Sequence, residues 1–188
     1  MARYPDGHKD ATRARIVDEA ASAYREHGLA GIGIQALMRR LGLTHGGFYV
    51  HFQSRDDLVA AAIGRAAEDV SERLRGSTTG ADAVGQYIDR YLSEQHRDHP
   101  GHGCPVAALG AEAPRQSGPV QAALERAARG FMSSLSGTTA VKESMTDEAI
   151  GVASVLVGAL VLSRALGDGP ASKRVLTVGR RIARKLLA

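Results

Sequence analysis

The chain has 188 residues, of which 44% are hydrophobic, so it has enough apolar material for a globular core and wholesale disorder is excluded. A formal net charge of +4 permits an anionic partner such as nucleic acid without requiring one. The single cysteine, Cys104, excludes an internal disulfide, and the first ten residues contain no apolar signal segment, so we expect a cytoplasmic protein.

The N-terminal part of the sequence shows a helical pattern that is divided by turn residues. Apolar residues at helical spacing predict a first helix over about 9–27 and a short second helix over about 34–41. Gly42 then interrupts the pattern. Hydroxyl residues that favour helix N-termini predict two more helices, one over about 44–51 and one over about 54–75.

The remaining sequence is also helical in pattern and shows no strand-like alternation. The run 149–163 is the most apolar, but it is shorter than the ~20 residues that cross a bilayer and it contains two glycines. We therefore expect a buried helix there and no membrane contact. The predicted fold class is all-α. The predicted helices of this part cover about 81–98, 105–113, 118–136, 146–166 and 171–187.

The two short helices around Gly42 predict a helix-turn-helix, because helices of this length are too short to be stable alone. Gly42 can supply the positive φ that the turn needs. The second of these helices is then expected to enter the major groove of DNA with its first residues, Thr44, His45 and Gly46, near the base edges. Tyr49 lies one turn along, where its phenol can reach a phosphate.

Three other ring-bearing residues of this segment are expected to have structural roles. Phe48 and Phe52 are four residues apart, so both can point back from the helix and anchor it to its neighbours. We expect His51 to pack or hydrogen-bond at the helix end instead of contacting bases.

The segment "RIVDEAASAYREHGLAGIGIQALMRRLGLTHGGFYVHFQSRDDLV" resembles the DNA-binding domain of the tetracycline-repressor (TetR) family of bacterial transcription regulators. The resemblance covers about residues 10–60, and beyond them only the all-helical layout and the motif "GCPVAALGAE" are similar. The matching residues are Tyr24, Gly28, Gly42, Leu43, Thr44, Gly47, Phe48, Tyr49, His51, Phe52, Ser54, Arg55, Asp57 and Leu58.

The resemblance implies an N-terminal helix-turn-helix DNA-binding domain of three helices, residues 1–60, and a C-terminal helical ligand-binding and dimerisation domain, residues 61–188. It implies a dimeric regulator that is not an enzyme and uses no cofactor. It also implies a repressor that a small inducer releases from a near-palindromic operator in double-stranded DNA.

Three further residues are candidates for DNA contact. Gly33 stands where the family usually has Ser or Thr at the start of the second helix, so a phosphate contact there would use backbone N–H groups. Arg55 replaces the family's usual Lys and can contact phosphate with its planar guanidinium. Arg39, on the second helix, can neutralise a phosphate or remain a solvated surface charge.

The last two helices, about 146–187, are the expected homodimer interface. One helix-turn-helix contacts only a few base pairs, so useful affinity usually requires a two-fold dimer. The first of the two helices is apolar nearly all round, and its small residues permit a close approach of another helix. The second has one apolar face and six basic residues. The resemblance implies a four-helix bundle between subunits.

The resemblance also implies a ligand cavity inside the C-terminal domain. Nothing in the sequence identifies the ligand, and apolar residues at helical spacing are equally well explained as core. The candidate lining residues are Tyr87, Tyr91, Cys104, Leu109, Glu112, Phe131 and Met132.

Cys104 is a candidate redox or electrophile sensor. Pro105 suits the first position of a helix, which places Cys104 at the N-terminal cap, near the positive end of the helix dipole. That position and the nearby His102 are expected to lower the thiol pKa and favour the thiolate. A small residue that simply packs well is the alternative.

The cluster His96, His99, His102 and Cys104 also suggests two other functions. Its spacing is not a common zinc pattern, so we expect no metal site. An enzyme could use Cys104 as a nucleophile, His102 or His99 as the base, and Glu112 to orient the base. A third possibility is a helical ligand-binding protein whose helix-turn-helix does not bind DNA.

Overall fold

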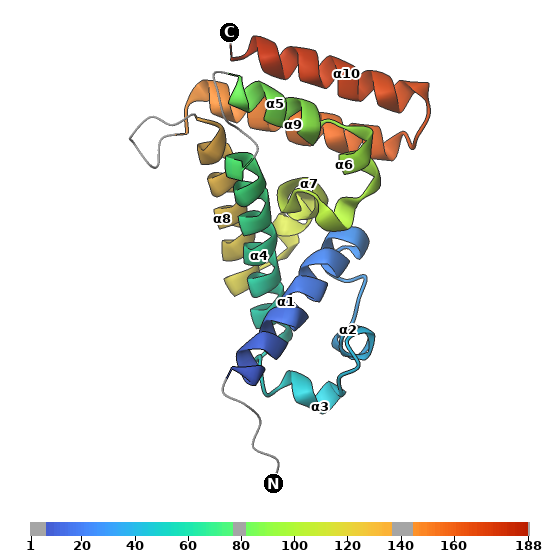
Figure 1. Ribbon diagram of the computed structural model, residues 1–188, viewed down its shortest axis with the longest axis vertical. Helices are drawn as coiled ribbons and strands as arrows, with labels where there is room; N and C mark the ends of the chain where they lie inside the picture. The colour runs from blue at the N-terminus through green and yellow to red at the C-terminus, as the bar shows by residue number, and fades with distance from the viewer. Residues whose placement is uncertain (1–6, 77–81, 137–144, 188) are drawn as a thin grey trace.

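Every regular element of the protein is helical within residues 7–76, 82–136 and 145–187, the ranges that the computed structural model describes (Figure 1). This confirms the predicted all-α class. The helix-turn-helix lies at one end of the molecule and the last two helices lie at the other (Figure 1).

The N-terminal part contains four helices close to the predicted ranges. They are α1 (His8–His27), α2 (Ile34–Arg40), α3 (His45–Phe48) and α4 (Arg55–Gly76). Gly42 has a φ of +70° between α2 and α3, which confirms that the turn requires a residue tolerant of the left-handed region.

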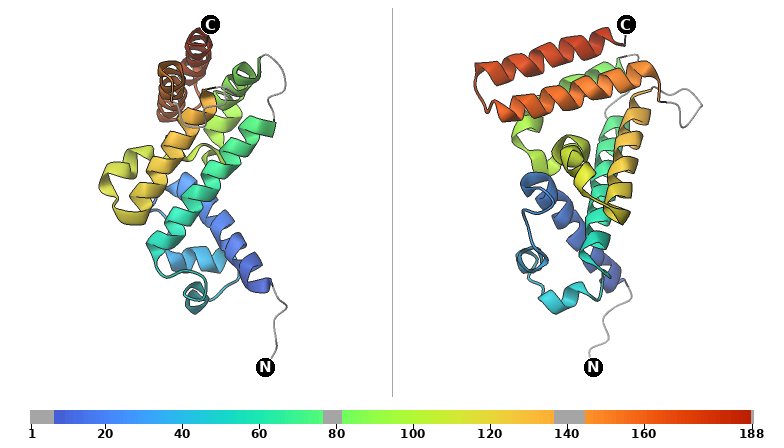
Figure 2. Two further views of the ribbon diagram at one scale, coloured as in Figure 1. Left: turned by 90° about the vertical axis from the view of Figure 1, so that its left-hand side faces the viewer. Right: turned by 180° about the vertical axis from the view of Figure 1, so that it is seen from behind.

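The C-terminal part contains six α-helices and two short 3-10 helices among the described residues. The helices α4 and α8 pack side by side, and the pair α9 and α10 lies across their ends (Figure 2). The elements are α5 (Ala83–Tyr91), α6 (Glu94–Asp98), η1 (Pro100–His102), α7 (Pro105–Leu109), η2 (Gly110–Arg115), α8 (Gly118–Leu135), α9 (Asp147–Ala165) and α10 (Pro170–Lys185).

Two predicted helices are broken in the structure, and one is shorter. The prediction of one helix over 81–98 was wrong, because the chain turns at Leu92 and Ser93 and the Ser93 hydroxyl accepts the amide of His96 at 3.1 Å to start α6. Residues 105–113 divide into α7 and η2. The regular part of α3 ends at Phe48, and three turn residues follow it before Phe52.

The core of the N-terminal part continues into the C-terminal part. Buried side chains of α1 to α4 form one cluster with Leu109 of α7 and with Val120 and Leu124 of α8. A second cluster lies under α5, α9 and α10. The domain boundary expected at residue 60 falls inside α4, so the two parts share a packed helix there.

The antiparallel helices α9 and α10 approach each other closely. A Cβ atom added to Gly179 would lie 2.7 Å from the Cβ of Ala159 and 2.9 Å from Cδ1 of Leu92, so only glycine fits at this crossing. Leu176 and Ala183 lie on the same side of α10 and are buried. This side of α10 packs on α9, and its other side is exposed.

Candidate nucleic-acid interface and ligand pocket

The end of the molecule formed by α2 and α3 is a helix-turn-helix held from behind by buried side chains. Thr44 caps α3, its hydroxyl accepting the amide of Gly47 at 3.2 Å. Leu37, Met38 and Phe48 are buried beneath the two helices, with exposed fractions of 1% or less. This packing stabilises a helix of only four residues that would not persist alone.

The outer side of α3 is exposed, and it presents the residues predicted at the tip. Thr44, His45 and Gly46 are all exposed, and a Cβ atom added to Gly46 would meet nothing within 4 Å. Tyr49 is 62% exposed and its ring packs edge-on against His45, with 5.8 Å between the ring centroids. Val50, 58% exposed, was not predicted, and only its exposure next to Tyr49 identifies it.

Two other predicted DNA-contact residues also lie at the surface of this end. Gly33 is the N-cap residue of α2 and is exposed, with no side chain to cap the helix. Arg39 is exposed near the end of α2. Its neighbour Arg40 forms an ion pair with Glu19 of the same chain, with 3.2 Å between the guanidinium nitrogen and the carboxylate oxygen. Arg39 is therefore the better placed of the two to meet a phosphate.

Arg55 has an intramolecular role that the sequence did not predict. Its guanidinium donates a hydrogen bond to the carbonyl of Leu29 and lies 5.8 Å from the centre of the Tyr24 ring. Arg55 thus ties the start of α4 to the segment after α1. Its contact with a phosphate stays a prediction.

Phe52 and His51 form the other border of this surface. Phe52 is buried, stacks on Phe48 with 5.4 Å between the ring centroids, and has the guanidinium of Arg13 over its outer face at 4.9 Å. Burial, with Lys9 and Arg13 nearby, lowers the pKa of His51. Arg13 is exposed beside α3 and is a candidate phosphate contact that the sequence analysis missed.

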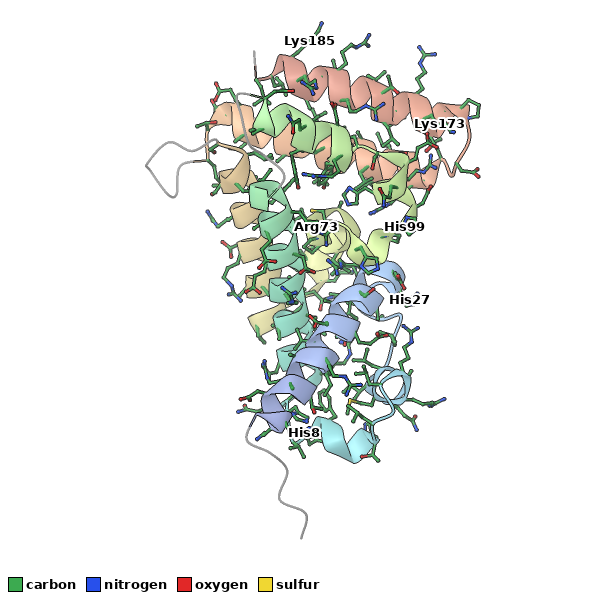
Figure 3. The ribbon with its side chains drawn as sticks, in the orientation of Figure 1. His8, His27, Arg73, His99, Lys173 and Lys185 are labelled. Carbon is green, nitrogen blue, oxygen red and sulfur yellow. The ribbon has the colours of Figure 1, made fainter. Side chains whose placement is uncertain are left out.

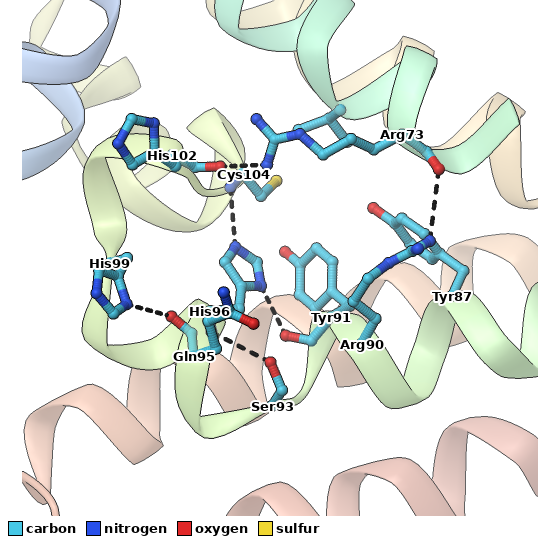
Figure 4. A pocket seen from close by; sticks show the side chains of 11 residues that line it. Arg73, Tyr87, Arg90, Tyr91, Ser93, Gln95, His96, His99, His102 and Cys104 are labelled. Carbon is cyan, nitrogen blue, oxygen red and sulfur yellow. Dashed lines mark hydrogen bonds between the residues drawn. The ribbon is translucent and has the colours of Figure 1, made fainter. Parts of the chain in front are cut away.

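A cavity of about 370 Å³, which we call the α5–α6 pocket, lies between α4, α5, α6 and the segment around η1 (Figure 4). Three of the seven predicted lining residues border it, namely Tyr87, Tyr91 and Cys104. The described residues that line it are Val70, Arg73, Tyr87, Arg90, Tyr91, Ser93, Gln95, His96, His99, His102 and Cys104.

The other four predicted residues lie elsewhere. Leu109 is in the N-terminal core cluster. Glu112 accepts the backbone amide of Leu29 at 3.1 Å and is not among the residues that line the pocket. Phe131 stacks on Tyr91 with 5.5 Å between the ring centroids and borders a smaller cavity of about 30 Å³, and Met132 packs against the second core cluster.

Cys104 differs from the expectation of a reactive thiolate. It is the N-cap residue of α7, as predicted, but its side chain is only 2% exposed. Burial raises the pKa of the Cys104 thiol, because a thiolate would lose its hydration. The predicted lowering of this pKa was therefore wrong. The five residues of α7 also form too short a helix for a large dipole.

His96 is a structural residue of the pocket wall. Its Nε2 accepts the backbone amide of Cys104 at 3.0 Å, so Nδ1 carries the proton that is donated to the carbonyl of Tyr91 at 2.6 Å. Burial lowers the pKa of His96 to about 4, and the ring is neutral at pH 7. Within the described ranges, no three His, Cys, Asp or Glu side chains are grouped to hold a metal ion.

The two pocket tyrosines are buried phenols. Burial raises the pKa of both Tyr87 and Tyr91, so both stay protonated. The Tyr91 hydroxyl is buried and lies beside the thiol of Cys104, a weak hydrogen-bond acceptor. Among the described residues it has no stronger partner. The hydroxyl can therefore exchange a weak partner for a stronger acceptor inside the cavity.

The segment from His99 to Cys104 connects the pocket with α1. The buried guanidinium of Arg25 on α1 donates to the carbonyl of Gly103 at 3.0 Å. On the pocket side, Arg73 donates a hydrogen bond to the carbonyl of His102. A Cβ atom on Gly101 would lie 2.3 Å from Oε1 of Glu26, so the segment is pressed against α1. His99 lies beside the end of α1 marked by His27 in Figure 3.

At the opposite end of the molecule, α9 and α10 expose apolar side chains, which we call the α9/α10 apolar face. Val178, Ile182 and Leu186 are four residues apart and lie along the exposed side of α10, whose ends are marked by Lys173 and Lys185 in Figure 3. The large side chains of the face, 37–59% exposed, are Ile150, Val161, Leu162, Leu166, Val178, Ile182, Leu186 and Leu187.

Comparison with known proteins places the helix-turn-helix in a described family. Residues 16–62 match the family model of bacterial regulatory proteins of the tetR family. Uncharacterised HTH-type transcriptional regulators from two strains of Mycobacterium tuberculosis are 29% identical to the chain over 102 residues. The match covers 54% of this chain and 53% of each relative, so the chain matches only about half of the length of these relatives.

Solved structures share the fold over nearly the whole chain. A TetR-family regulator from Cytophaga hutchinsonii has a TM-score of 0.74 at 18% identity, covering 98% of each chain. One from Chloroflexus aurantiacus has a TM-score of 0.73 at 24% identity, covering 92% of this chain and 94% of the other. The reduced form of Escherichia coli NemR has a TM-score of 0.72 at 19% identity, covering 92% and 96%.

Proposed function

The chain belongs to the tetR family of bacterial regulatory proteins, and on that premise we propose that it is a homodimeric transcriptional repressor that a small ligand releases from a near-palindromic DNA operator. The observation that carries the DNA-binding part is the exposed surface of α3. Thr44, His45 and Tyr49 project outward from a helix whose inner side is completely buried. Thr44 caps α3 and the Tyr49 ring packs against His45, but all three side chains lie outside the core, and their exposed faces are free to meet a groove.

The shape of this surface suits the major groove. Gly46 adds no side chain, so the backbone of α3 can approach the bases closely. Tyr49 can donate to a phosphate from the flank of the helix, and Arg39 and Arg13 can add charge contacts on either side. The neutral His51 is half-buried behind them and contributes to packing.

The α9/α10 apolar face supports the homodimer. An apolar surface of this kind is usually covered by a partner, and a second copy of the same face forms a symmetric four-helix contact. Among the described residues, α9 alone is long and apolar enough to cross a membrane. A helix buried between subunits has the same composition, and we propose that dimerisation is its role and that the protein acts in the cytoplasm.

The α5–α6 pocket supports release by a small ligand. Its wall includes the segment from His99 to Cys104, which also contacts α1 of the helix-turn-helix domain through Arg25. A ligand that moves this segment would change the position of α1 relative to α4, and with it the spacing of the two recognition helices. Because the buried Cys104 thiol has a raised pKa, we propose ligand binding, and not thiol modification, as the signal.

The geometry does not favour the enzyme alternative. The carboxylate expected to orient a base, Glu112, is bound to the Leu29 amide and lines no part of the pocket. The expected nucleophile, Cys104, is buried with a raised thiol pKa, and Nδ1 of His99, one of the two expected bases, is bonded to the carbonyl of Gln95 at 2.9 Å. We therefore propose a regulator without catalytic activity.

The DNA-binding proposal can be tested by fluorescence anisotropy at several salt concentrations. The protein is titrated onto DNA duplexes that together cover the region upstream of its gene. We expect tight binding to one near-palindromic segment, with an affinity that falls steeply as salt increases. Equal and weak binding to every duplex, including scrambled DNA, would contradict it and favour a ligand-binding protein that does not bind DNA.

A further inference from the structure

The described residues that line the α5–α6 pocket give it a positive charge. They include the guanidinium groups of Arg73 and Arg90 and no Asp or Glu. Arg90 donates to the backbone carbonyl of Arg73 at 3.4 Å, whereas the Arg73 guanidinium extends to the carbonyl of His102, so the two guanidinium groups border different parts of the opening (Figure 4). Asp69 lies 4.0 Å from Arg73 and offsets part of its charge, so the lining keeps an excess of positive charge.

The inner part of the pocket is aromatic and buried. Tyr87 and Tyr91 are each 4% exposed, their ring centroids are 5.7 Å apart, and Val70 borders the same cavity. His96 packs edge-on against Tyr91 with 4.6 Å between the ring centroids. Among the described residues, the Tyr91 hydroxyl has no partner stronger than the weakly accepting thiol of Cys104.

We propose that the α5–α6 pocket binds a small aromatic carboxylate, with its anionic group in the positive field of Arg73 and Arg90 and an acceptor atom opposite the Tyr91 hydroxyl. The proposal rests on the proposed function, since it specifies the chemical class of the releasing ligand. The flat body of such a ligand would lie against the tyrosine rings, where stacking and burial of apolar surface favour it.

Other ligand classes fit these groups less well. An amine or quaternary ammonium would face two guanidinium groups with no carboxylate in the lining to receive it. A small hydrophilic anion would leave Tyr87, Tyr91 and Val70 uncovered. An entirely apolar molecule would leave the Tyr91 hydroxyl with no acceptor stronger than the Cys104 thiol among the described residues.

Isothermal titration calorimetry of the full chain with three probes of one shape tests the charge preference: naphthoate, naphthamide and naphthylmethylamine. We expect naphthoate to bind at least about tenfold more tightly than the amide, and the amine to bind most weakly. Equal affinity for the acid and the amide, tighter binding of the amine, or no binding of naphthoate at millimolar concentration would each overturn the proposal.

Two variants locate the ligand. Arg90→Gln should reduce naphthoate affinity about tenfold and leave naphthamide affinity unchanged, whereas the matched control Arg129→Gln, on the exposed side of α8, should change neither. A hydroxynaphthoate, whose hydroxyl lies on the ring without the carboxylate and opposite Tyr91, should bind more tightly than naphthoate. Tyr91→Phe should remove this gain in affinity. A loss of affinity in Arg129→Gln equal to that in Arg90→Gln would indicate a general effect of charge and overturn the site.

Operator binding, measured on the same samples, separates the two proposals. Specific DNA binding together with indifference to naphthoate would overturn the ligand class and leave the regulator intact. Naphthoate binding without any specific DNA binding would support the pocket chemistry and overturn the proposed function.

Discussion

At the scale of single residues, the side chains proposed to face DNA separate clearly from those that hold the fold. Tyr49 is 62% exposed, and the adjacent Phe48 is completely buried. Tyr49→Ala should weaken operator binding by about 1 kcal/mol per half-site, or roughly 30-fold for a dimer, through loss of a phosphate hydrogen bond. Its melting temperature should stay near that of the wild type. Anisotropy and circular dichroism measure the two quantities.

The adjacent position supplies the contrast for this prediction. Phe48→Ala should lower the free energy of unfolding by about 3–5 kcal/mol, because it opens a cavity in the core. If Tyr49→Ala destabilised the fold as much as Phe48→Ala does, its effect on DNA could not be assigned to a direct contact.

His96 links stability to pH. Its pKa is about 4 in the folded protein, below the ordinary value near 6.5, because the neutral ring is buried and bonded to the backbone. The unfolded chain therefore binds a proton that the folded protein does not between these two pH values, and stability falls as the pH drops from about 6.5 to 4. The loss from this group is about 3 kcal/mol at most.

Chemical denaturation at several pH values checks this prediction in wild type and in His96→Gln. The variant should be less stable at pH 7, and its stability should fall less steeply with acid than that of the wild type. Parallel curves for the two proteins would assign the acid sensitivity to other groups.

At the scale of elements, the sequence predicted the helices that end at a glycine. It missed the helix breaks that depend on tertiary contacts. Gly28 and Gly42 have φ angles of +77° and +70°, so the ends of α1 and α2 followed from residue type. The break at Ser93 was missed because its hydroxyl can cap a helix or remain solvated within one. Its role depends on His96 and Cys104, which bond across the turn.

The ligand pocket shows the same difference between local and tertiary information. Tyr87 and Tyr91 were candidates for the lining of the cavity that the family resemblance implies, and both line the pocket. Arg73 and Arg90 were not predicted, because charged residues on a helix usually face solvent. Glu112 was misplaced because its partner, the Leu29 amide, is 83 residues away in sequence.

The connection between α1 and the pocket depends on one buried guanidinium. Arg25 is 5% exposed, donates to the carbonyls of Ala21 and Gly103, and lies 3.9 Å from Asp69. Arg25→Leu should lower the free energy of unfolding by about 2–4 kcal/mol, because it leaves buried acceptors without a donor. Arg15→Leu, at an exposed position of the same helix, should change it by no more than about 0.5 kcal/mol. Urea denaturation compares the two, and an equal effect would show that Arg25 is not a link.

At the scale of the whole molecule, the three proposed functional surfaces follow one another along the long axis. The helix-turn-helix is at one end, the helices α9 and α10 are at the other, and the segment from α6 to α7, which borders the α5–α6 pocket, lies between them (Figure 1). A dimer formed at one end fixes the separation of the DNA-binding surfaces at the other. Half-sites one helical turn apart, about 34–36 Å, or a multiple of this, require that separation to be held. A ligand near the middle can change it.

This arrangement predicts that dimerisation and operator binding are lost together. Ile182 is 39% exposed at the centre of the apolar stripe on α10, so Ile182→Asp leaves the core of the subunit intact and places two like charges near each other in a symmetric dimer. We expect a folded monomer by sedimentation velocity and circular dichroism. Its operator affinity should fall at least about a hundredfold, because two half-sites no longer bind as one unit.

The control is Gln121→Asp, which adds the same charge at an exposed position of α8 outside the apolar face. It should remain dimeric and bind the operator as the wild type does. A dimeric Ile182→Asp protein would show that the subunits associate through another surface. A monomer that kept full operator affinity would show that one helix-turn-helix is sufficient for operator binding. The mechanism would then not require a two-fold operator.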